Sequence, residues 1–160
     1  MNRPSRADIA LEIQNFMALY WEEVEKNEGR RAADHFDEEA VFDARMVRFE
    51  GRQQIRDWFA WRESVGRTAR HLLSNLHFDF SGWENERTVD IRGVMTHFAG
   101  DGRGVLPIGP PIAIYDYRMI VREGGDFGWT ILRLETDPVF VAPDHVALRY
   151  AAEDGEQPGT

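Results

Sequence analysis

The spacing of the apolar residues changes along the chain close to Gly66. Before that point, except in a short segment over 40–51, apolar side chains recur at intervals of three and four residues, which is the spacing of one face of an α-helix. They do so from Ile9 to Val24 and again from Ile55 to Phe59. After Gly66 the spacing approaches two, as is typical of β-strands. Helices followed by a run of antiparallel strands predict an α+β fold in which a curved sheet wraps around the helices.

Both predicted helices are bounded by residues that favour helix ends. Ser5 and Asp8 form a potential capping pair ahead of the first helix, and Gly29 ends it. A second, short helix is expected over 32–36. Gly66 ends the helix predicted over 52–65.

The remaining segments predict strands joined by turns. A short hairpin closed by glycine is expected over 40–51, long strands over 68–80 and 87–100, and a strand pair joined by the turn GGDFG over 112–141. The stretch SGWENE, 81–86, is expected to be a turn. The Gly/Pro-rich stretch 101–111 is expected to be a loop, because proline cannot join a central strand. A sheet bent over a long helix leaves a cavity at its open end, where ligands bind.

Composition limits the class of protein. The length of 160 residues predicts one domain over 1–150, followed by a polar and disordered tail over 151–160. A net charge of −9 argues against a nucleic-acid partner. No apolar run approaches the ~20 residues that span a bilayer, and no secretory signal is evident, so we expect a cytoplasmic protein without a membrane partner.

Cofactors and metals are not expected. The chain has no cysteine and contains neither a phosphate loop nor a dinucleotide fingerprint. Its five histidines do not follow a metal-binding spacing. His71 and His77 are six residues apart on one strand, or roughly 20 Å, which is too far to bind one metal ion.

The end of the first helix is acidic, and two interpretations of Glu25 are open. Glu25 can continue the solvent face of Glu22, Glu23 and Glu28. Alternatively, the helix stops at Gly29 because its last acid belongs in a pocket.

The strand over 68–80 raises the question of which face is inside. Under strict alternation, one face carries His71, Leu73, Asn75, His77 and Asp79, and the other Leu72, Ser74, Leu76, Phe78 and Phe80. The second face is more apolar, which would leave His71 in solvent. The conflict disappears if the first face lines a polar pocket while the second packs against another subunit or element. An exposed apolar face predicts a homo-oligomer, a dimer or a trimer.

The stretch VEKNEGRRAADHFDEEAVF, 24–42, followed by RHLLSNLHFDF, 70–80, resembles the NTF2-like (SnoaL-like) superfamily. The resemblance covers residues 7–138 and is nearest to the group of scytalone dehydratase, hexachlorocyclohexane dehydrochlorinase and bile-acid 7α-dehydratase. It implies an NTF2-like cone, with N-terminal helices packed in a curved, mainly antiparallel β-sheet.

The resemblance also implies a catalytic pair. In those lyases a carboxylate at the end of the first helix pairs with a histidine on the first long strand, and these positions look like Glu25 and His71. A polar residue five positions before the acid looks like Tyr20, and an arginine on the last strand looks like Arg133. Glutamate replaces the usual aspartate, and Arg133 follows Trp129 by four residues instead of five, a step that changes face on a strand.

This chemistry needs a base near neutrality and donors for an oxygen. Imidazole suits the first task, and a carboxylate on its far nitrogen fixes the tautomer and stabilises the imidazolium. Tyr20, Tyr115, Tyr117 and Arg133 are the candidate donors.

Four further residues are candidates for substrate binding, each with a structural alternative. Asp43 is a second acid or base, or a surface carboxylate at a sheet edge. Asn75 orients a substrate, or bonds across the strand. His97 approaches the cavity from the next strand, or is structural. Trp58 contacts a ligand as part of the cavity wall, or belongs to the core, and it is not taken as part of a cofactor site.

Two functions of different class follow. The first is a cofactor-independent lyase (dehydratase-like) or isomerase that acts on a hydrophobic, ring-containing small molecule with a His-Glu dyad as general base. The second is a non-catalytic small-molecule-binding protein, or a structural subunit similar to the aromatic-ring dioxygenase β subunit.

Overall fold

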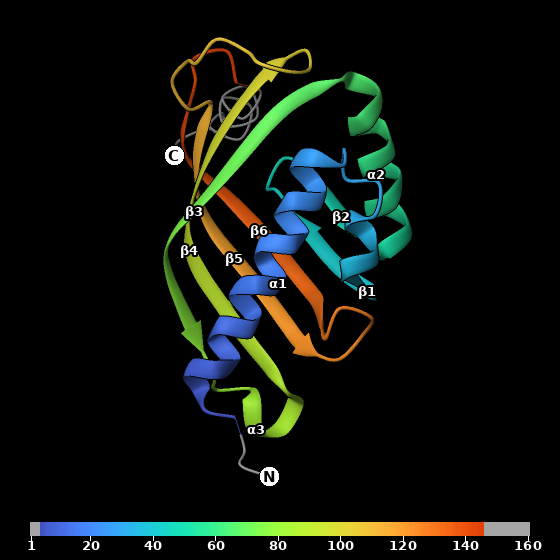
Figure 1. Ribbon diagram of the computed structural model, residues 1–160, viewed down its shortest axis with the longest axis vertical. Coiled ribbons are helices and arrows are strands. Elements are labelled where there is room, and N and C mark those ends of the chain that lie inside the picture. The colour runs from blue at the N-terminus through green and yellow to red at the C-terminus, as the bar shows by residue number, and fades with distance from the viewer. Residues whose placement is uncertain (1–3, 146–160) are drawn as a thin grey trace, which may run out of the picture.

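A computed structural model describes residues 4–145 of the chain, which form helices on one side of a single curved sheet (Figure 1). The tail expected over 151–160 lies outside the described residues. In chain order the elements are α1 Arg6–Lys26, the 3₁₀-helix η1 Ala32–His35, β1 Phe36–Asp43, β2 Arg48–Glu50, α2 Arg52–Val65, β3 Arg67–Asp79, α3 Trp83–Glu86, β4 Thr88–Asp101, β5 Ala113–Glu123 and β6 Trp129–Val141.

Helix α1 begins and ends where the sequence predicts. The Ser5 N–H donates to the Asp8 carboxylate at 2.9 Å while the Asp8 N–H donates to the Ser5 hydroxyl at 3.2 Å, which completes a capping box. The chain leaves the helix through Gly29, whose φ of 73° suits a residue without Cβ. A Cβ there would lie 2.5 Å from the Phe59 ring, so this turn packs directly on α2.

The sheet has six strands in the order β2-β1-β6-β5-β4-β3. All neighbours are antiparallel except β1 and β6, which are parallel. Helix α1 lies across the concave face, while α2 packs against β1 and η1 (Figure 1). The predicted α+β fold with a curved, mainly antiparallel sheet is therefore confirmed. No helix within residues 4–145 has the length and apolar character needed to cross a membrane.

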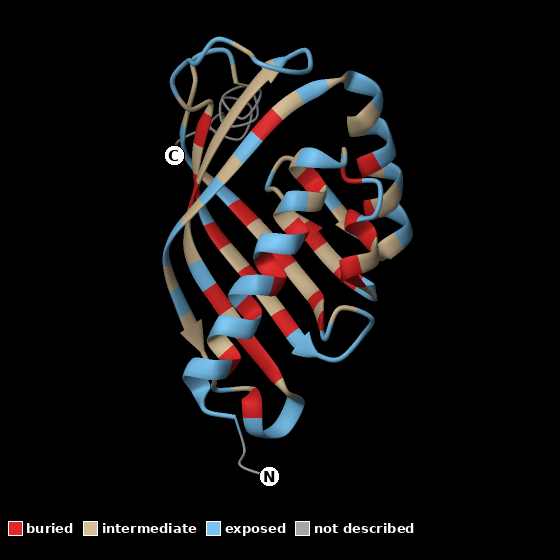
Figure 2. Cartoon of the chain, viewed as in Figure 1, coloured by how far each residue is buried: buried red, intermediate tan, exposed pale blue. Residues whose placement is uncertain are grey.

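The core lies between α1 and the concave face of the sheet, where buried positions concentrate (Figure 2). Its largest fully buried side chains are Tyr20, Phe36, Ile9, Ile13, Ile55, Ile91, Met119, Ile131 and Leu134. Each contributes roughly 1.5–3 kcal/mol by leaving water, so the amphipathic face of α1 fixes the helix to the sheet.

The stretch expected to be a turn at 81–86 contains one helical turn, α3. Trp83 of α3 is buried beside Trp129, with ring centroids 5.9 Å apart, and the Arg87 guanidinium lies 3.6 Å from its ring centroid. Tertiary packing of one tryptophan therefore decides the local structure here.

Strand β3 contains a β-bulge that strict alternation could not predict. The pairing with β4 shifts between Ser74 and His77, and Asn75 has a φ of 53°. Two residues thus oppose Gly93, where a Cβ would lie 2.7 Å from the Ser74 carbonyl oxygen. A bulge of this kind exchanges the faces of all residues that follow it.

The bulge resolves the question of which β3 face is inside. Before it, His71 and Leu73 face the helices; after it, Leu76 and Phe78 do so, and both pack against the core. Leu72 alone of the expected outer apolar face is strongly exposed, at 57%. The prediction of a continuous exposed apolar face on this strand is therefore wrong. The homo-oligomer that we expected from it remains an untested prediction.

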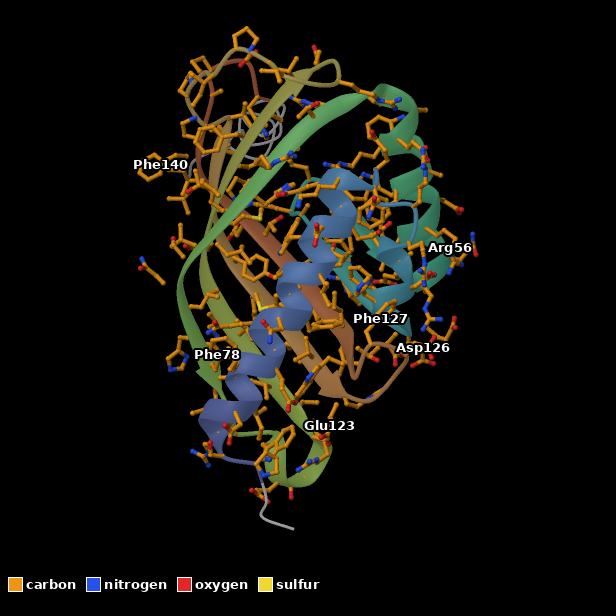
Figure 3. The ribbon with its side chains drawn as sticks, in the orientation of Figure 1. Arg56, Phe78, Glu123, Asp126, Phe127 and Phe140 are labelled. Carbon is orange, nitrogen blue, oxygen red and sulfur yellow. The ribbon has the colours of Figure 1, made fainter. Side chains whose placement is uncertain are left out.

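Exposed apolar residues gather elsewhere, at the end of β6 and in the loop after β4. Phe140 projects from the molecule (Figure 3), and Ile108 belongs to the expected loop.

The bulge gives a first prediction. Asn75→Val should lower the free energy of unfolding by about 1–3 kcal/mol, because a β-branched residue is strained at positive φ. Asn75→Gly should leave it unchanged or raise it. Urea denaturation measures both, with Ser74→Val as the control on the exposed neighbour, expected within about 0.5 kcal/mol of the unmodified protein. Equal stability of Asn75→Val and Asn75→Gly would contradict the left-handed conformation.

Candidate active site

A pocket of about 190 Å³ lies between the C-terminal half of α1, α2 and the concave face of the sheet. Its walls are mainly aromatic and aliphatic. The lining residues are Tyr20, Trp21, Val24, Phe42, Ala44, Met46, Val47, Trp58, Phe59, Arg62, His71, Met95, His97, Tyr115, Thr136 and His145.

Glu25 and His71 form a close pair at this pocket. Nδ1 of His71 lies 3.2 Å from Oε1 of Glu25, and the same oxygen accepts the backbone N–H of His71. Both side chains are nearly buried, at 8% exposed for His71 and 12% for Glu25. Glu25 therefore does not continue the solvent face of α1. The carboxylate holds Nδ1 and leaves Nε2 as the imidazole nitrogen that can accept a proton.

The fold brings this pair together from both sides. Glu25 lies in the last turn of α1, just before the chain turns away at Gly29. His71 lies on β3 four residues before the bulge, on the stretch whose odd-numbered residues face the helix. The Arg70 guanidinium reaches the second carboxylate oxygen at 3.9 Å from the more exposed side.

Burial lowers the pKa of His71 below its ordinary value of 6.5. The hydrogen bond and charge of Glu25 act in the opposite direction, and Arg62 and Arg70 add to the lowering. The imidazole is therefore neutral at pH 7 and available as a base.

Three rings form a stack beside this pair. The ring centroids of Trp21 and His71 lie 4.4 Å apart, and those of His71 and His97 lie 4.3 Å apart with an interplanar angle of 18°. Register pairs His71 with His97 across β3 and β4. Burial, assisted by the charges of His71 and Arg62, lowers the pKa of His97 to about 2. His97 is therefore a neutral neighbour that fixes the plane of the His71 ring.

Several polar atoms around the pocket are buried with few partners. Among the described residues, His97 Nε2 is buried without a hydrogen bond, and Trp21 Nε1 and the Tyr117 hydroxyl have no partner but, at most, each other. A buried polar atom without a partner costs about 1–3 kcal/mol unless a ligand or water bonds to it. Burial raises the pKa of both Tyr20 and Tyr117 above 10, so their hydroxyls stay protonated and can donate.

The structure brings most of the candidate residues together. His71, Tyr20, His97, Tyr115 and Trp58 line the pocket. Glu25 lies directly behind His71, and the Tyr117 ring lies 6.4 Å from that of Trp21.

Three candidates lie elsewhere, and these expectations are corrected. Asp43 bonds to Arg48 at 2.9 Å in an open groove on the outer face of the sheet. Asn75 is exposed because it is the bulge residue. Arg133 donates to Glu135 at 2.6 Å on the outer face, consistent with its shifted spacing from the strand start.

Other residues line the pocket that were not among the candidates, above all Trp21 and Arg62. Arg62 follows Trp58 by four residues on α2, so it shares the helix face that points to the pocket. An arginine on an otherwise apolar stripe was the available signal. Among residues 4–145, no group of three or more histidines and acids is placed to hold a metal ion.

Comparison with known proteins agrees with the fold. The pattern that defines the SnoaL-like domain matches residues 5–135. No curated protein matches the sequence significantly. Similar solved structures include a Novosphingobium aromaticivorans protein to which scytalone dehydratase activity has been ascribed, with a TM-score of 0.70, 20% identity, and coverage of 86% of this chain and 88% of that chain.

Two further structures are similar at the same level. A Novosphingobium aromaticivorans protein ascribed to the aromatic ring hydroxylases has a TM-score of 0.65 and 22% identity, covering 86% and 93% of the two chains. A Catenulispora acidiphila protein in complex with S-DNPA has a TM-score of 0.66 and 19% identity, covering 92% and 99%. At sequence identities this low, the structural similarity shows a common fold and nothing further.

The buried histidines give a second prediction. A histidine whose pKa is lowered in the folded state contributes stability that is complete above about pH 6.5 and is lost as pH falls below it. The free energy of unfolding should therefore fall as the solution is acidified from pH 6.5. His97→Phe keeps an aromatic ring at this position but cannot bind a proton. It should therefore reduce the dependence of the unfolding free energy on pH by about 1.4 kcal/mol per pH unit. Urea denaturation between pH 7.5 and 5 measures it, and equal slopes would contradict a buried, neutral His97.

Proposed function

Because this chain belongs to the SnoaL-like domain family, we propose that it is a cofactor-independent lyase of the dehydratase type, or an isomerase. Its substrate is a hydrophobic, ring-containing small molecule. The observation that carries this proposal is the contact of Glu25 with His71 at the wall of an apolar pocket.

His71 acts as the general base in this mechanism. Nε2 removes the proton from the carbon next to a carbonyl group, while Glu25 accepts the Nδ1–H bond and stabilises the imidazolium. In dehydration, the electron pair of the broken C–H bond forms the C=C bond as the neighbouring C–O bond breaks. The leaving hydroxide takes the proton from Nε2 and departs as water. In isomerisation, the imidazolium returns the proton to a different carbon.

Donors at the pocket support the developing negative charge. The Tyr20 hydroxyl, which stays protonated, belongs to a residue that lines the pocket, and so does the indole N–H of Trp21. Such donors stabilise an oxyanion more strongly in a pocket that excludes water. The ring stack of Trp21, His71 and His97 keeps the base in one orientation.

One observation favours the non-catalytic alternative. Oε1 of Glu25 also accepts the backbone N–H of His71, so the carboxylate attaches the end of α1 to β3 whether or not the imidazole reacts. A small-molecule-binding protein, or a structural subunit, would need only this attachment.

A panel of cyclic β-hydroxy ketones separates the two functions. Their dehydration forms conjugated enones that are followed by ultraviolet absorbance. His71→Gln should lower kcat by about 10²–10⁴-fold, because the positioned base is lost, while ligand affinity changes little. His77→Gln, on the exposed part of the same strand, is the matched control and should retain turnover. Exchange of the α-proton in D₂O, observed by NMR, tests the isomerase.

Full turnover by His71→Gln, or no turnover and no exchange by the unmodified protein with any ketone that binds, would favour the non-catalytic alternative.

The pH dependence provides an independent prediction. Because the pKa of His71 is lowered below 6.5, kcat/KM should be level above pH 6.5 and decline only at lower pH. Glu25 raises the pKa of His71, so Glu25→Gln should move the decline to still lower pH while reducing the rate. A rate profile between pH 4.5 and 8.5 measures both. A decline that begins above pH 7, or one that Glu25→Gln leaves in place, would contradict the dyad.

A further inference from the structure

Arg62 contributes a positive charge to the pocket without an acidic partner. It lies on α2 and lines the pocket together with His71 and Tyr20. Its Nη1 donates a hydrogen bond to the Val24 carbonyl oxygen at 3.0 Å, near the C-terminal end of α1. Among residues 4–145, no carboxylate forms an ion pair with it.

The acids near Arg62 have other partners. Glu25 bonds to His71 and lies 3.9 Å from Arg70, and Glu28 lies 3.4 Å from Arg103. Both raise the pKa of Arg62 from a distance, but burial is the larger effect and lowers it. A guanidinium has five N–H donors and stays charged in proteins, so most of its binding capacity is available.

The pocket wall that the structure describes lacks acidic side chains. The chain contains 28 acidic residues and 19 Lys and Arg residues, yet none of the residues that line the pocket in the described part of the chain is Asp or Glu. Of the lining residues within 4–145, Arg62 and three histidines are the only titratable groups other than tyrosines. A carboxylate-free, apolar wall around one arginine favours an anion and disfavours a cation.

The volume limits the size of the ligand. An apolar cavity of roughly 150 Å³ accommodates a benzene ring. The pocket, at about 190 Å³, therefore has room for one ring and a small substituent, with any further part of the ligand at the mouth.

We propose that the ligand is an organic acid built on a single ring, with its carboxylate bound by Arg62 and its ring held against the aromatic wall beside His71. This inference rests on the proposed function only in taking this pocket as the site. Arg62 would form charge-assisted hydrogen bonds to the carboxylate while its bond to the Val24 carbonyl keeps the guanidinium in place.

Matched pairs of ring acids and amides test the proposal. The probes are benzoate with benzamide, and cyclohexanecarboxylate with cyclohexanecarboxamide, titrated by calorimetry at pH 7.5. The unmodified protein should bind each acid at least about tenfold more tightly than its amide, as expected for a hydrogen bond to a charged group. Arg62→Gln should remove this preference, and Arg62→Lys should retain part of it.

Arg56→Gln is the matched control. Arg56 lies on the same helix, on the side directed away from the sheet, where it contacts Asp34 at 3.3 Å (Figure 3). It should preserve the preference for acids. Circular dichroism checks that every variant is folded; if Arg62→Gln is not, the acid–amide ratio of the unmodified protein and of Arg62→Lys decides.

Three outcomes would overturn the proposal: no measurable binding of either acid, equal affinity for acid and amide, or an acid preference that a folded Arg62→Gln retains. His71→Gln separates this result from the catalytic one. If it binds acids selectively but has no turnover, both proposals stand. If acid selectivity depends on Arg62 while His71→Gln turns over normally, the substrate class stands and the general base is wrong.

Discussion

The contact between the Glu25 carboxylate and His71 is the interaction on which the rest of the site depends. It joins the last turn of α1 to the first half of β3 by two bonds to one oxygen, and so fixes the end of the pocket. A buried carboxylate is tolerated only if it is paired or hydrogen-bonded. The hydrogen bond from the backbone N–H of His71 meets this need whether the imidazole ring is neutral or protonated. The pair thus connects α1 to β3 and also sets the chemical environment of the imidazole.

The pocket is kept open at a cost in stability. Nε2 of His97 is buried without a hydrogen bond to any described residue, and burial holds the pKa of His97 far below its usual value. An aliphatic side chain in place of this polar one would remove the energetic penalty. Such side chains fill other parts of the space between α1 and the sheet. Local departures from an optimal core of this kind are typical of functional sites. The departures here gather around one imidazole, which supports that imidazole as the centre of the function.

Periodicity predicted the helices and the sheet, because these depend on spacing along the chain, whereas the Glu25–His71 pair was implied by the family resemblance alone. The bulge at Asn75 depends on a residue in another strand, Gly93, whose missing side chain makes room for it. Strict alternation therefore assigned the wrong face to everything after Ser74. The sequence shows Arg62 only as an arginine on an apolar helix face; that no carboxylate among the described residues lines the pocket around it is a property of the folded arrangement.

The charge of Arg62 links binding of an acid to the strength of the base. In the free protein Arg62 lowers the pKa of His71, and thus keeps the imidazole neutral but a weaker base. A carboxylate bound to Arg62 would cancel this effect, and its own charge would stabilise the imidazolium that forms when Nε2 takes a proton. The base would then be stronger when the substrate is present than when the pocket is empty. If Arg62 binds the substrate carboxylate and His71 is the general base, as proposed, the charge of the substrate and the strength of the base would be tuned together.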